Sequence, residues 1–273
     1  MSEFHCVATL LIVPARSLPP LLAVLVAAGV ALAGCGLPLP SPGAGAGVPH
    51  APTRVGPGSA AGGATASSGP SPVPTLTPAQ ARAALATLGG LPVKGRAPRT
   101  GYDRDAFGPA WSDDVDVSLG RNGCDTRNDV LRRDLVAERL KAGTHGCVVV
   151  SGTLADPYTG RSITFVRGRA TSSKVQIDHV VALGDAWVTG AQQLTATERR
   201  TLANDPLNLL AVDGPTNSAK RDADAASWLP PNKAYRCTYV ARQVAVKSRY
   251  RLWVTTAEKA QIARVLAGCG GVR

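Results

Sequence analysis

A short series of polar residues in the middle of the chain has the composition of a reactive site. Asp178 and His179 lie within the β-branched apolar segment 175–181, which predicts a strand. Asn208 directly precedes a second apolar run, residues 209–212, which predicts another strand. Two neighbouring strands would therefore carry an acid, an imidazole and an amide.

A short helix is expected directly after the second strand. Residues 213–215, Asp-Gly-Pro, break the apolar run, and proline is favourable at the first turn of a helix. Asn217, Lys220 and Arg221 would lie on this helix. The polar residues are thus distributed over a strand, a second strand and a helix.

These residue types suit the hydrolysis of a phosphodiester. That reaction needs a general base for water and a cation for the charge that develops on the phosphate. His179 is the candidate base, because an imidazole titrates nearest to neutral pH. Asp178 and Asn217 offer the oxygen ligands that a hard divalent ion such as Mg²⁺ or Mn²⁺ prefers.

Three further side chains would support this chemistry. Asn208 is expected either to fix the tautomer of the imidazole through its side-chain carbonyl or to brace the two strands. Lys220 and Arg221 would hold the phosphate. Each of these features alone is common in strands, turns or solvated faces. The prediction therefore depends on their order along the chain.

The same residues form motifs that resemble the His-Asn-His or His-Asn-Asn signature of HNH nucleases, whose core is a ββα-metal finger. The motifs are Asp-His-Val-Val-Ala-Leu at 178–183, Asn-Leu-Leu-Ala-Val at 208–212 and Asn-Ser-Ala-Lys at 217–220. The resemblance is closer to the branch related to the C-terminal domain of GmrSD-type restriction endonucleases, including secreted actinobacterial members. It extends over roughly residues 101–269, through motifs at 102–104, 107–108, 124–127, 228–231 and 235–237.

The resemblance implies a fold and roles for the residues. The fold would be α+β, with a ββα-metal finger embedded in a mostly helical domain stapled by disulfides. His179 would be the general base, Asp178 and Asn217 the metal ligands, and Asn208 the residue that orients the base. The last position of the signature is Asn217 rather than His, and an amide oxygen binds a hard metal more weakly than a carboxylate would. DNA cleaved with low sequence preference is the expected substrate.

A basic helix is expected on the N-terminal side of this centre. Asp125 or Asn128 would cap it, and an apolar stripe at helical spacing extends it to about residue 142. The other side of the helix is basic. Arg127 is the candidate there for a further phosphate contact.

The N-terminal segment has the features of an export signal followed by a tether. The apolar run 21–33 is too short for a comfortable membrane span and ends at Cys35 in a Leu-Ala-Gly-Cys sequence that resembles a bacterial lipobox. Residues 1–34 are thus predicted to be a lipoprotein signal peptide, with Cys35 lipidated; an ordinary cleaved secretory signal is the alternative. Residues 35–76, rich in Gly, Ala, Ser and Pro, read as a flexible tether to a nuclease domain at 77–273.

Four cysteines remain in the predicted domain, and an even number in an exported domain implies disulfides. Of the three possible pairings we expect Cys124 with Cys147 and Cys237 with Cys269, because each would close a helix onto its neighbour. Zinc binding is disfavoured because no two of these cysteines have the spacing of a zinc ligand pair.

The net charge of +11 indicates a polyanionic partner, which includes nucleic acid but also teichoic acids and anionic lipid headgroups. Aromatic residues are few, which argues against a stacking platform for single strands. Two other functions stay open. One is a polyanion-binding lipoprotein that keeps the scaffold but does not cut. The other is a cell-wall hydrolase, although the sequence has no His-Glu-x-x-His motif.

Overall fold

The structure is a computed structural model and describes residues 76–269. The predicted signal peptide, Cys35 and nearly all of the tether lie outside these residues. The helices of the described chain are α1 Pro78–Gly90, α2 Thr126–Asp134, α3 Leu183–Val188, α4 Ala196–Asn204, α5 Gly214–Lys220, α6 Arg236–Arg249 and α7 Thr256–Gly268. The strands are β1 Leu135–Leu140, β2 Val149–Ala155, β3 Ser162–Val166, β4 Val175–His179 and β5 Leu209–Asp213.

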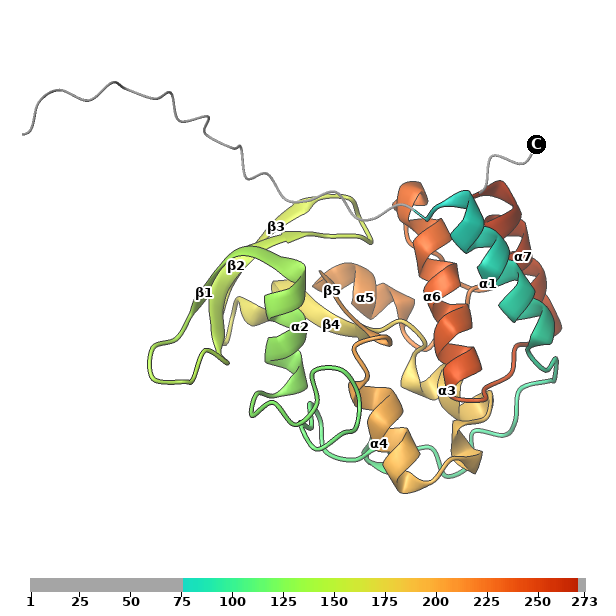
Figure 1. Ribbon diagram of the computed structural model, residues 1–273, viewed down its shortest axis with the longest axis horizontal. Coiled ribbons are helices and arrows are strands. Elements are labelled where there is room, and N and C mark those ends of the chain that lie inside the picture. Colours follow the sequence, from blue (N-terminus) through green and yellow to red (C-terminus); the bar gives the residue numbers. More distant parts are fainter. Residues whose placement is uncertain (1–75, 270–273) are drawn as a thin grey trace, which may run out of the picture. The chain divides into compact units, whose positions relative to one another are not determined.

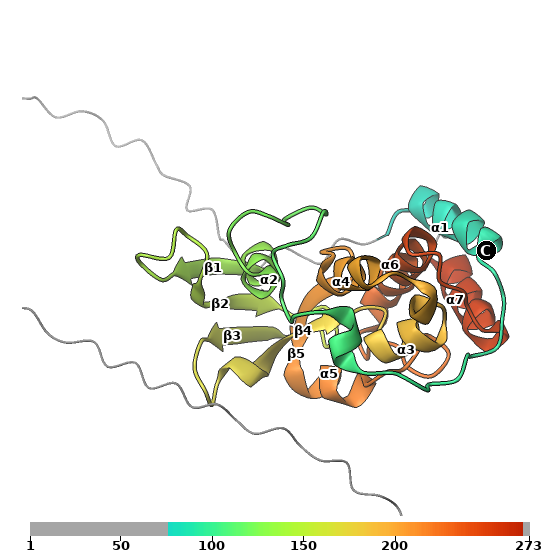
Figure 2. The ribbon, with the colours of Figure 1, turned by 90° about the horizontal axis from the view of Figure 1, so that it is seen from below.

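The fold is mixed α+β, with two small antiparallel sheets. One sheet has the order β1-β2-β3, and the other is the pair β4-β5. The β4-β5 pair lies between the three-stranded sheet and the helices α1, α6 and α7 (Figures 1 and 2). Two apolar clusters explain this arrangement. In one cluster, residues of β4 and β5 pack with residues of α2, β2 and β3. In the other, different residues of β5 pack with residues of α1, α6 and α7.

The β4-β5 pair and α5 follow the predicted order of strand, strand and helix. Asp178 pairs with Leu210 and His179 with Leu209 in the antiparallel register. The helix α5 begins directly after β5 and packs against both strands. Pro215 lies in its first turn, and the side chain of Asp213 accepts a hydrogen bond from the backbone N–H of Thr216 at its N-terminus. Local turn chemistry thus sets the start of α5, as the sequence predicted.

One predicted helix is wrong in its second half. The helix capped by Asp125 ends at Asp134, and the chain then continues as β1 instead of remaining helical to residue 142. Leu135 of β1 pairs with Leu154 of β2. The spacing of the apolar residues fits a helix. Pairing with β2, however, gives the backbone of 135–140 hydrogen-bond partners in a sheet. This tertiary interaction outweighs the local preference for a helix.

The helical layer agrees with its sequence signals. Capping boxes at Thr77, Thr195 and Thr255 begin α1, α4 and α7. The segment 251–254 forms only an isolated bridge, between Val254 and Val93. Among the helices at 76–269, none is long and apolar enough to cross a membrane.

Both predicted disulfides are present. Cys124–Cys147 joins the segment before α2 to the segment before β2, with Cα atoms 5.2 Å apart. Cys237–Cys269 joins the first turn of α6 to the C-terminal end of α7, with Cα atoms 5.8 Å apart. Such bonds persist in oxidising compartments, so they fit a protein that is exported.

Candidate functional site

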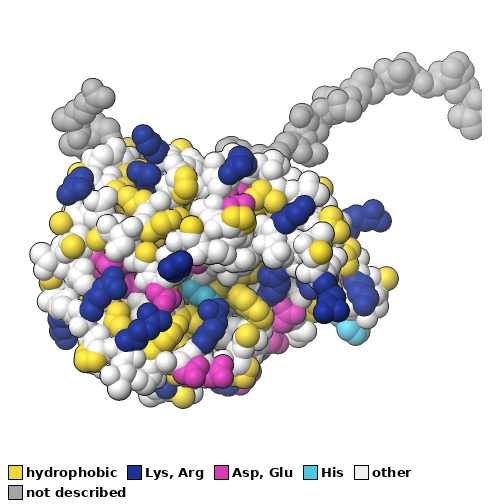
Figure 3. Space-filling model, turned by 180° about the vertical axis from the view of Figure 1, so that it is seen from behind, with side chains coloured by type: hydrophobic (Ala, Val, Ile, Leu, Met, Phe, Trp, Pro, Cys, Tyr) yellow, Lys and Arg dark blue, Asp and Glu magenta, His cyan; other side chains and the backbone are white. Residues whose placement is uncertain are grey.

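Four of the predicted site residues line one hollow of about 190 Å³. Asp178 and His179 come from the end of β4, Asn217 comes from α5, and Arg221 follows that helix. The pairing of β4 with β5 and the packing of α5 on both strands bring these residues together, although they are far apart in sequence. On the face shown in Figure 3, a histidine side chain is visible near the centre, with Lys and Arg side chains around it.

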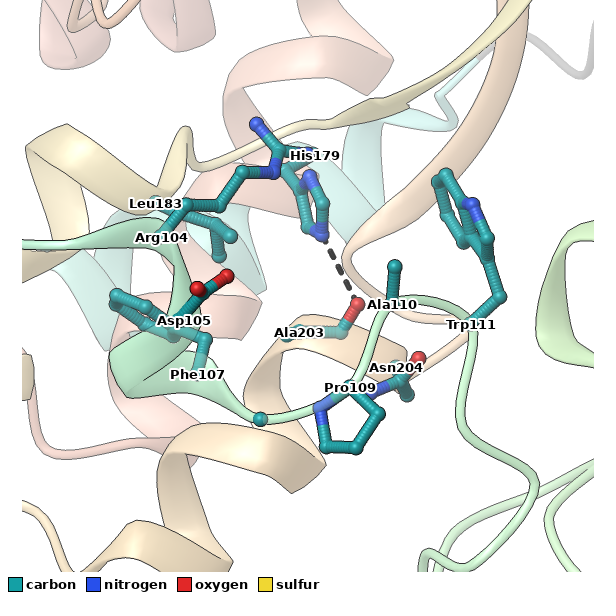
Figure 4. Close-up of a pocket in the computed structure, with 11 residues that line it drawn as sticks. Arg104, Asp105, Phe107, Pro109, Ala110, Trp111, His179, Leu183, Ala203 and Asn204 are labelled. Atoms are coloured by element: carbon teal, nitrogen blue, oxygen red, sulfur yellow. Dashed lines mark hydrogen bonds between the residues drawn. The ribbon is translucent and has the colours of Figure 1, made fainter.

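The imidazole of His179 is buried and held in one tautomer. Its Nε2 lies 2.9 Å from the backbone oxygen of Ala203, at the end of α4 (Figure 4). A carbonyl oxygen can only accept, so Nε2 carries the proton and Nδ1 is the basic atom. The pKa of His179 is lowered to about 3, chiefly by burial; the hydrogen bond to Ala203 opposes this shift, and the charges of Arg104 and Lys220 add to it. The imidazole is therefore neutral at pH 7 and can accept a proton.

The carboxylate of Asp178 is only 5% exposed and is bound on both oxygens. Its Oδ1 accepts a hydrogen bond from Nζ of Lys220 at 2.9 Å, and its Oδ2 accepts one from the hydroxyl of Tyr158 at 2.5 Å. Tyr158 belongs to the turn between β2 and β3, so a third segment of the chain positions this acid. The signal for Tyr158 in the sequence is only that of a turn, which explains why its role was not predicted.

Lys220 differs from its predicted role. Its side chain is fully buried, and Nζ donates to Asp178 and, at 2.7 Å, to the backbone oxygen of His179. The ammonium group thus neutralises the acid, and the predicted contact with phosphate has no support in this geometry. The next residue, Arg221, is exposed at the hollow and remains a candidate for that contact.

Asn208 is completely buried and braces the backbone around the imidazole. Its Oδ1 accepts a hydrogen bond from the N–H of Val181 at 2.8 Å. Its Nδ2 donates to the backbone oxygens of Val181 and Leu202, at 3.2 and 3.4 Å. Of the two predicted roles, the structure has the brace; the tautomer of His179 depends on Ala203 instead. Asn208 binds the backbone of Leu202, and the next residue, Ala203, binds the imidazole. Asn208 therefore positions the imidazole indirectly, through the backbone.

Arg104 is a residue of the site that the sequence did not assign. It begins a short 3₁₀ turn, Arg104–Phe107, which packs against α4, and it lines the hollow together with residues of α5. Its guanidinium lies beside His179 in Figure 4 and has no hydrogen-bond or ion-pair partner among residues 76–269. Its one signal in the sequence was its place in the motif at 102–104. An unpaired arginine at this position can bind an anion.

The structure places a second carboxylate in the hollow, whereas Arg127 lies outside it. Asp222 lines the hollow and accepts from Arg99 at 2.6 Å. A Cβ at Gly184 would lie 2.4 Å from its carboxyl carbon, so a larger residue at this position would force the carboxylate to move. Arg127 is half-buried in α2 and lines neither this hollow nor the smaller cavity beside His179. Its predicted phosphate contact stays a prediction.

The donor set of the hollow fits a hard cation that keeps much of its water. Within the described part of the chain, no three His, Cys, Asp or Glu side chains cluster as a closed metal site. Mg²⁺ commonly needs only one or two carboxylates, with waters and substrate phosphate completing its shell. Each oxygen of Asp178 uses one of its two acceptor positions for a hydrogen bond. The second position stays free, so Asp178 can still serve with Asn217 as a ligand of a cation. The neighbouring ammonium of Lys220 would weaken the binding of a cation.

Comparison with known proteins agrees with the motifs. Residues 125–265, more than half of the chain, match the family described as "GmrSD restriction endonucleases, C-terminal domain". The chain is also similar to a protein from Arthroderma benhamiae named "Uncharacterized secreted protein", with 39% identity over 191 residues, covering 69% of this chain and 86% of that protein. No solved structure gives a significant match. The chain therefore belongs to the family of GmrSD restriction endonuclease C-terminal domains.

Proposed function

We propose that this protein is an HNH-type endonuclease that hydrolyses phosphodiester bonds in nucleic acid with the help of a hard divalent cation, Mg²⁺ or Mn²⁺. The observation that carries the proposal is the convergence of His179, Asp178, Asn217 and Arg221 on one hollow. Two antiparallel strands followed by a helix packed on both support the interpretation of β4, β5 and α5 as a ββα-metal finger. The endonuclease family of the chain supports it as well.

In the proposed mechanism, Nδ1 of His179 takes the proton of the attacking water. The bond from Nε2 to Ala203 keeps the ring in the tautomer that leaves Nδ1 free for this. A pKa near 3 makes the imidazole a weak base in the free protein, and the negative charge of a bound phosphodiester would raise it. Asn208 keeps the ring in place by bracing the backbone on both sides of it.

The other residues bind and orient the phosphate. Asp178 and Asn217 would hold the cation, which supplies positive charge to the phosphate oxygens and the leaving oxygen when it is bound. Lys220 and Tyr158 fix the Asp178 carboxylate in a single orientation. Arg221 and Arg104, which both line the hollow, contribute charge to the phosphate without being neutralised by an acid in the described domain.

The experiment that tests this function is plasmid cleavage by the protein with its disulfides intact, in Mg²⁺, in Mn²⁺ and in chelator. We expect metal-dependent nicking that falls by roughly 10²–10⁴-fold in His179→Ala, because a positioned general base contributes about that much. DNA binding should persist in this variant. The matched control is His145→Ala, since His145 is exposed in the turn before β2 and lies outside the hollow.

Two results would count against the proposal. Equal cleavage by His179→Ala and the parent protein would remove His179 from the mechanism. A folded protein that binds DNA but does not cut it in either metal would favour the non-catalytic polyanion-binding lipoprotein on the same scaffold.

We also propose that the protein is exported and that Cys35 anchors it by lipid to the outer face of the cell membrane. The two disulfides support export, and the relative from Arthroderma benhamiae is itself named as secreted. Metabolic labelling with a fatty acid, compared between the parent and Cys35→Ala, tests the anchor. Equal labelling of both proteins would rule out lipidation at Cys35.

A further inference from the structure

A second cavity of about 70 Å³ adjoins the hollow and shares His179, Arg104 and Leu183 with it. Its other walls come from the segment 107–111 and from the end of α4 (Figure 4). The volume is several times what one water molecule requires. A group attached to a phosphate in the hollow would reach this cavity by passing the imidazole of His179.

The walls of this cavity combine apolar and polar groups and include one aromatic ring that faces the imidazole. Phe107, Pro109, Ala110 and Leu183 contribute apolar surface. The indole of Trp111 lies nearly parallel to the ring of His179, with an angle of 11° between the planes and 6.2 Å between the ring centroids. Trp111 is only half-buried, so its ring is accessible from the cavity. Such a surface suits a flat, weakly polar ring.

One polar atom in the cavity has no partner. Asn204, the last residue of α4, is 2% exposed, and its Nδ2 donates to the backbone oxygen of Arg200 at 2.9 Å. That bond identifies the other side-chain atom as the oxygen, because a carbonyl oxygen needs a donor. Oδ1 of Asn204 is buried and accepts no hydrogen bond in the structure. A buried acceptor without a donor is costly, so a small rotation of this side chain that brings Oδ1 to an N–H group of a ligand in the cavity would be favourable.

We propose that this cavity is a subsite for an unpaired nucleobase next to the scissile phosphate. The base rests against Trp111, and an N–H group on its edge donates to Oδ1 of Asn204. Every natural nucleobase has a flat ring and an N–H donor, so the subsite does not select a sequence. A base in this cavity has left the stack of a duplex, which costs energy. The substrate class is therefore single-stranded or locally unpaired nucleic acid, an inference that rests on the proposed nuclease function.

Binding measured in chelator, where no cleavage occurs, tests the subsite in the full-length protein. The probes are single-stranded oligothymidylate, an abasic strand of the same length, and a strand whose thymines are replaced by difluorotoluene, which has the same shape but no N–H donor. We expect oligothymidylate to quench tryptophan fluorescence and to bind about tenfold more tightly than the abasic strand. The difluorotoluene strand should fall between them. Trp111→Phe should abolish the quenching.

The variant Asn204→Ala should bind oligothymidylate and the difluorotoluene strand equally. If this variant does not fold, the comparison of the two strands on the parent protein still tests the acceptor. Equal affinity of the parent for the thymine and abasic strands would overturn the subsite. Equal affinity for the thymine and difluorotoluene strands would overturn the role of Asn204.

Cleavage in Mg²⁺ separates the subsite from the function on which it rests. A protein that distinguishes thymine from abasic strands but cuts neither strand nor plasmid, in Mg²⁺ or in Mn²⁺, would overturn the nuclease and keep the base subsite. A protein that cuts both strands and binds them equally would keep the nuclease and overturn the subsite.

Discussion

Nζ of Lys220 lies 2.9 Å from Oδ1 of Asp178, and both side chains are almost completely removed from solvent. The two residues come from α5 and β4, so the ion pair crosses the junction between the helix and the strand pair. A buried charge without a partner is strongly destabilising, whereas the intact pair contributes little net stability. The pair therefore matters chiefly because neither member can be removed alone.

Substitution of the two adjacent cations, Lys220 and Arg221, should consequently change stability by very different amounts. Lys220→Met leaves Asp178 buried without its partner and should lower the free energy of unfolding by about 3–5 kcal/mol. Arg221→Met should change it by less than about 0.5 kcal/mol, because Arg221 is exposed and has no ion-pair partner in the described chain. Urea denaturation measures both. Equal destabilisation by the two substitutions would contradict the burial of Lys220.

The same pair of variants separates stability from substrate binding. Arg221→Met should weaken DNA binding and flatten its dependence on salt, with a slope reduced by about one for one lost phosphate contact. Fluorescence anisotropy over a range of salt concentrations measures this slope. An unchanged slope would remove Arg221 from the phosphate contacts.

Arg104 should be required for cleavage but not for folding. It is exposed and unpaired in the part of the chain that the structure describes, and it lines the hollow beside His179. In Arg104→Ala we expect the cleavage rate to fall on the order of a hundredfold, because a charge aimed at the phosphate is lost. The matched control is Arg82→Ala, which removes the same charge from the exposed face of α1 and touches neither cavity. Equal rates for the two variants would show that only net charge matters.

The buried cluster of Lys247, Asp185 and Glu258 should make stability depend on pH. Nζ of Lys247 lies 2.7 Å from Glu258 and 3.1 Å from Asp185. Burial raises the pKa of Glu258 to about 7; Lys247 opposes this shift, and the charge of Asp185 adds to it. At pH values between the pKa of Glu258 in the unfolded chain, near 4.5, and its pKa in the folded protein, Glu258 is protonated in the native state and ionised in the unfolded state. The contribution of Glu258 to stability is therefore present at low pH and is lost as the pH rises through about 7.

Comparison of the parent with Glu258→Gln isolates this effect. Other groups titrate in the same range, but their contributions are shared by both proteins. The free energy of unfolding of the parent, relative to the variant, should fall with pH by at most about 1.4 kcal/mol per pH unit between roughly pH 5 and pH 7. Glutamine can keep the hydrogen bond from the backbone N–H of Thr255 at the start of α7. Parallel pH profiles for the two proteins would contradict the prediction.

The disulfide between Cys237 and Cys269 should stabilise the helical layer. It joins α6 to α7 across a separation of 32 residues, and the chain-entropy estimate for a loop of that size is about 3–4 kcal/mol. The double variant Cys237→Ser with Cys269→Ser should lose about this amount in urea denaturation. The parent protein in a reductant gives a control that also opens Cys124–Cys147, so it should lose more. An unchanged midpoint in the double variant would show that α6 and α7 stay together without the bond.

Features that depend on interactions between neighbouring residues, such as helix starts and strand positions, could be predicted from the sequence alone. Capping boxes at Thr77, Thr195 and Thr255 act within one helical turn, so the local sequence sets the starts of α1, α4 and α7. The β-branched segment 175–181 and the apolar run after Asn208 predicted β4 and β5, and Asp-Gly-Pro predicted the start of α5. The order of the polar residues on these elements was enough to bring them to one hollow, because antiparallel pairing followed by a helix has few arrangements.

Which of these groups are buried, and what they contact, depends on packing between distant parts of the chain. Lys220 and Arg221 are neighbours in the sequence, yet β4, more than forty residues earlier in the chain, surrounds the first while the second faces solvent. Arg104 and the open acceptor of Asn204 join the site through the packing of a distant loop on α4. The strand β1 formed where a helix was expected, because its partner β2 lies beyond the range of any local pattern. Many such contacts between distant residues together determine which side chains are buried and which strands pair. The physical roles of the site residues follow from this burial and pairing.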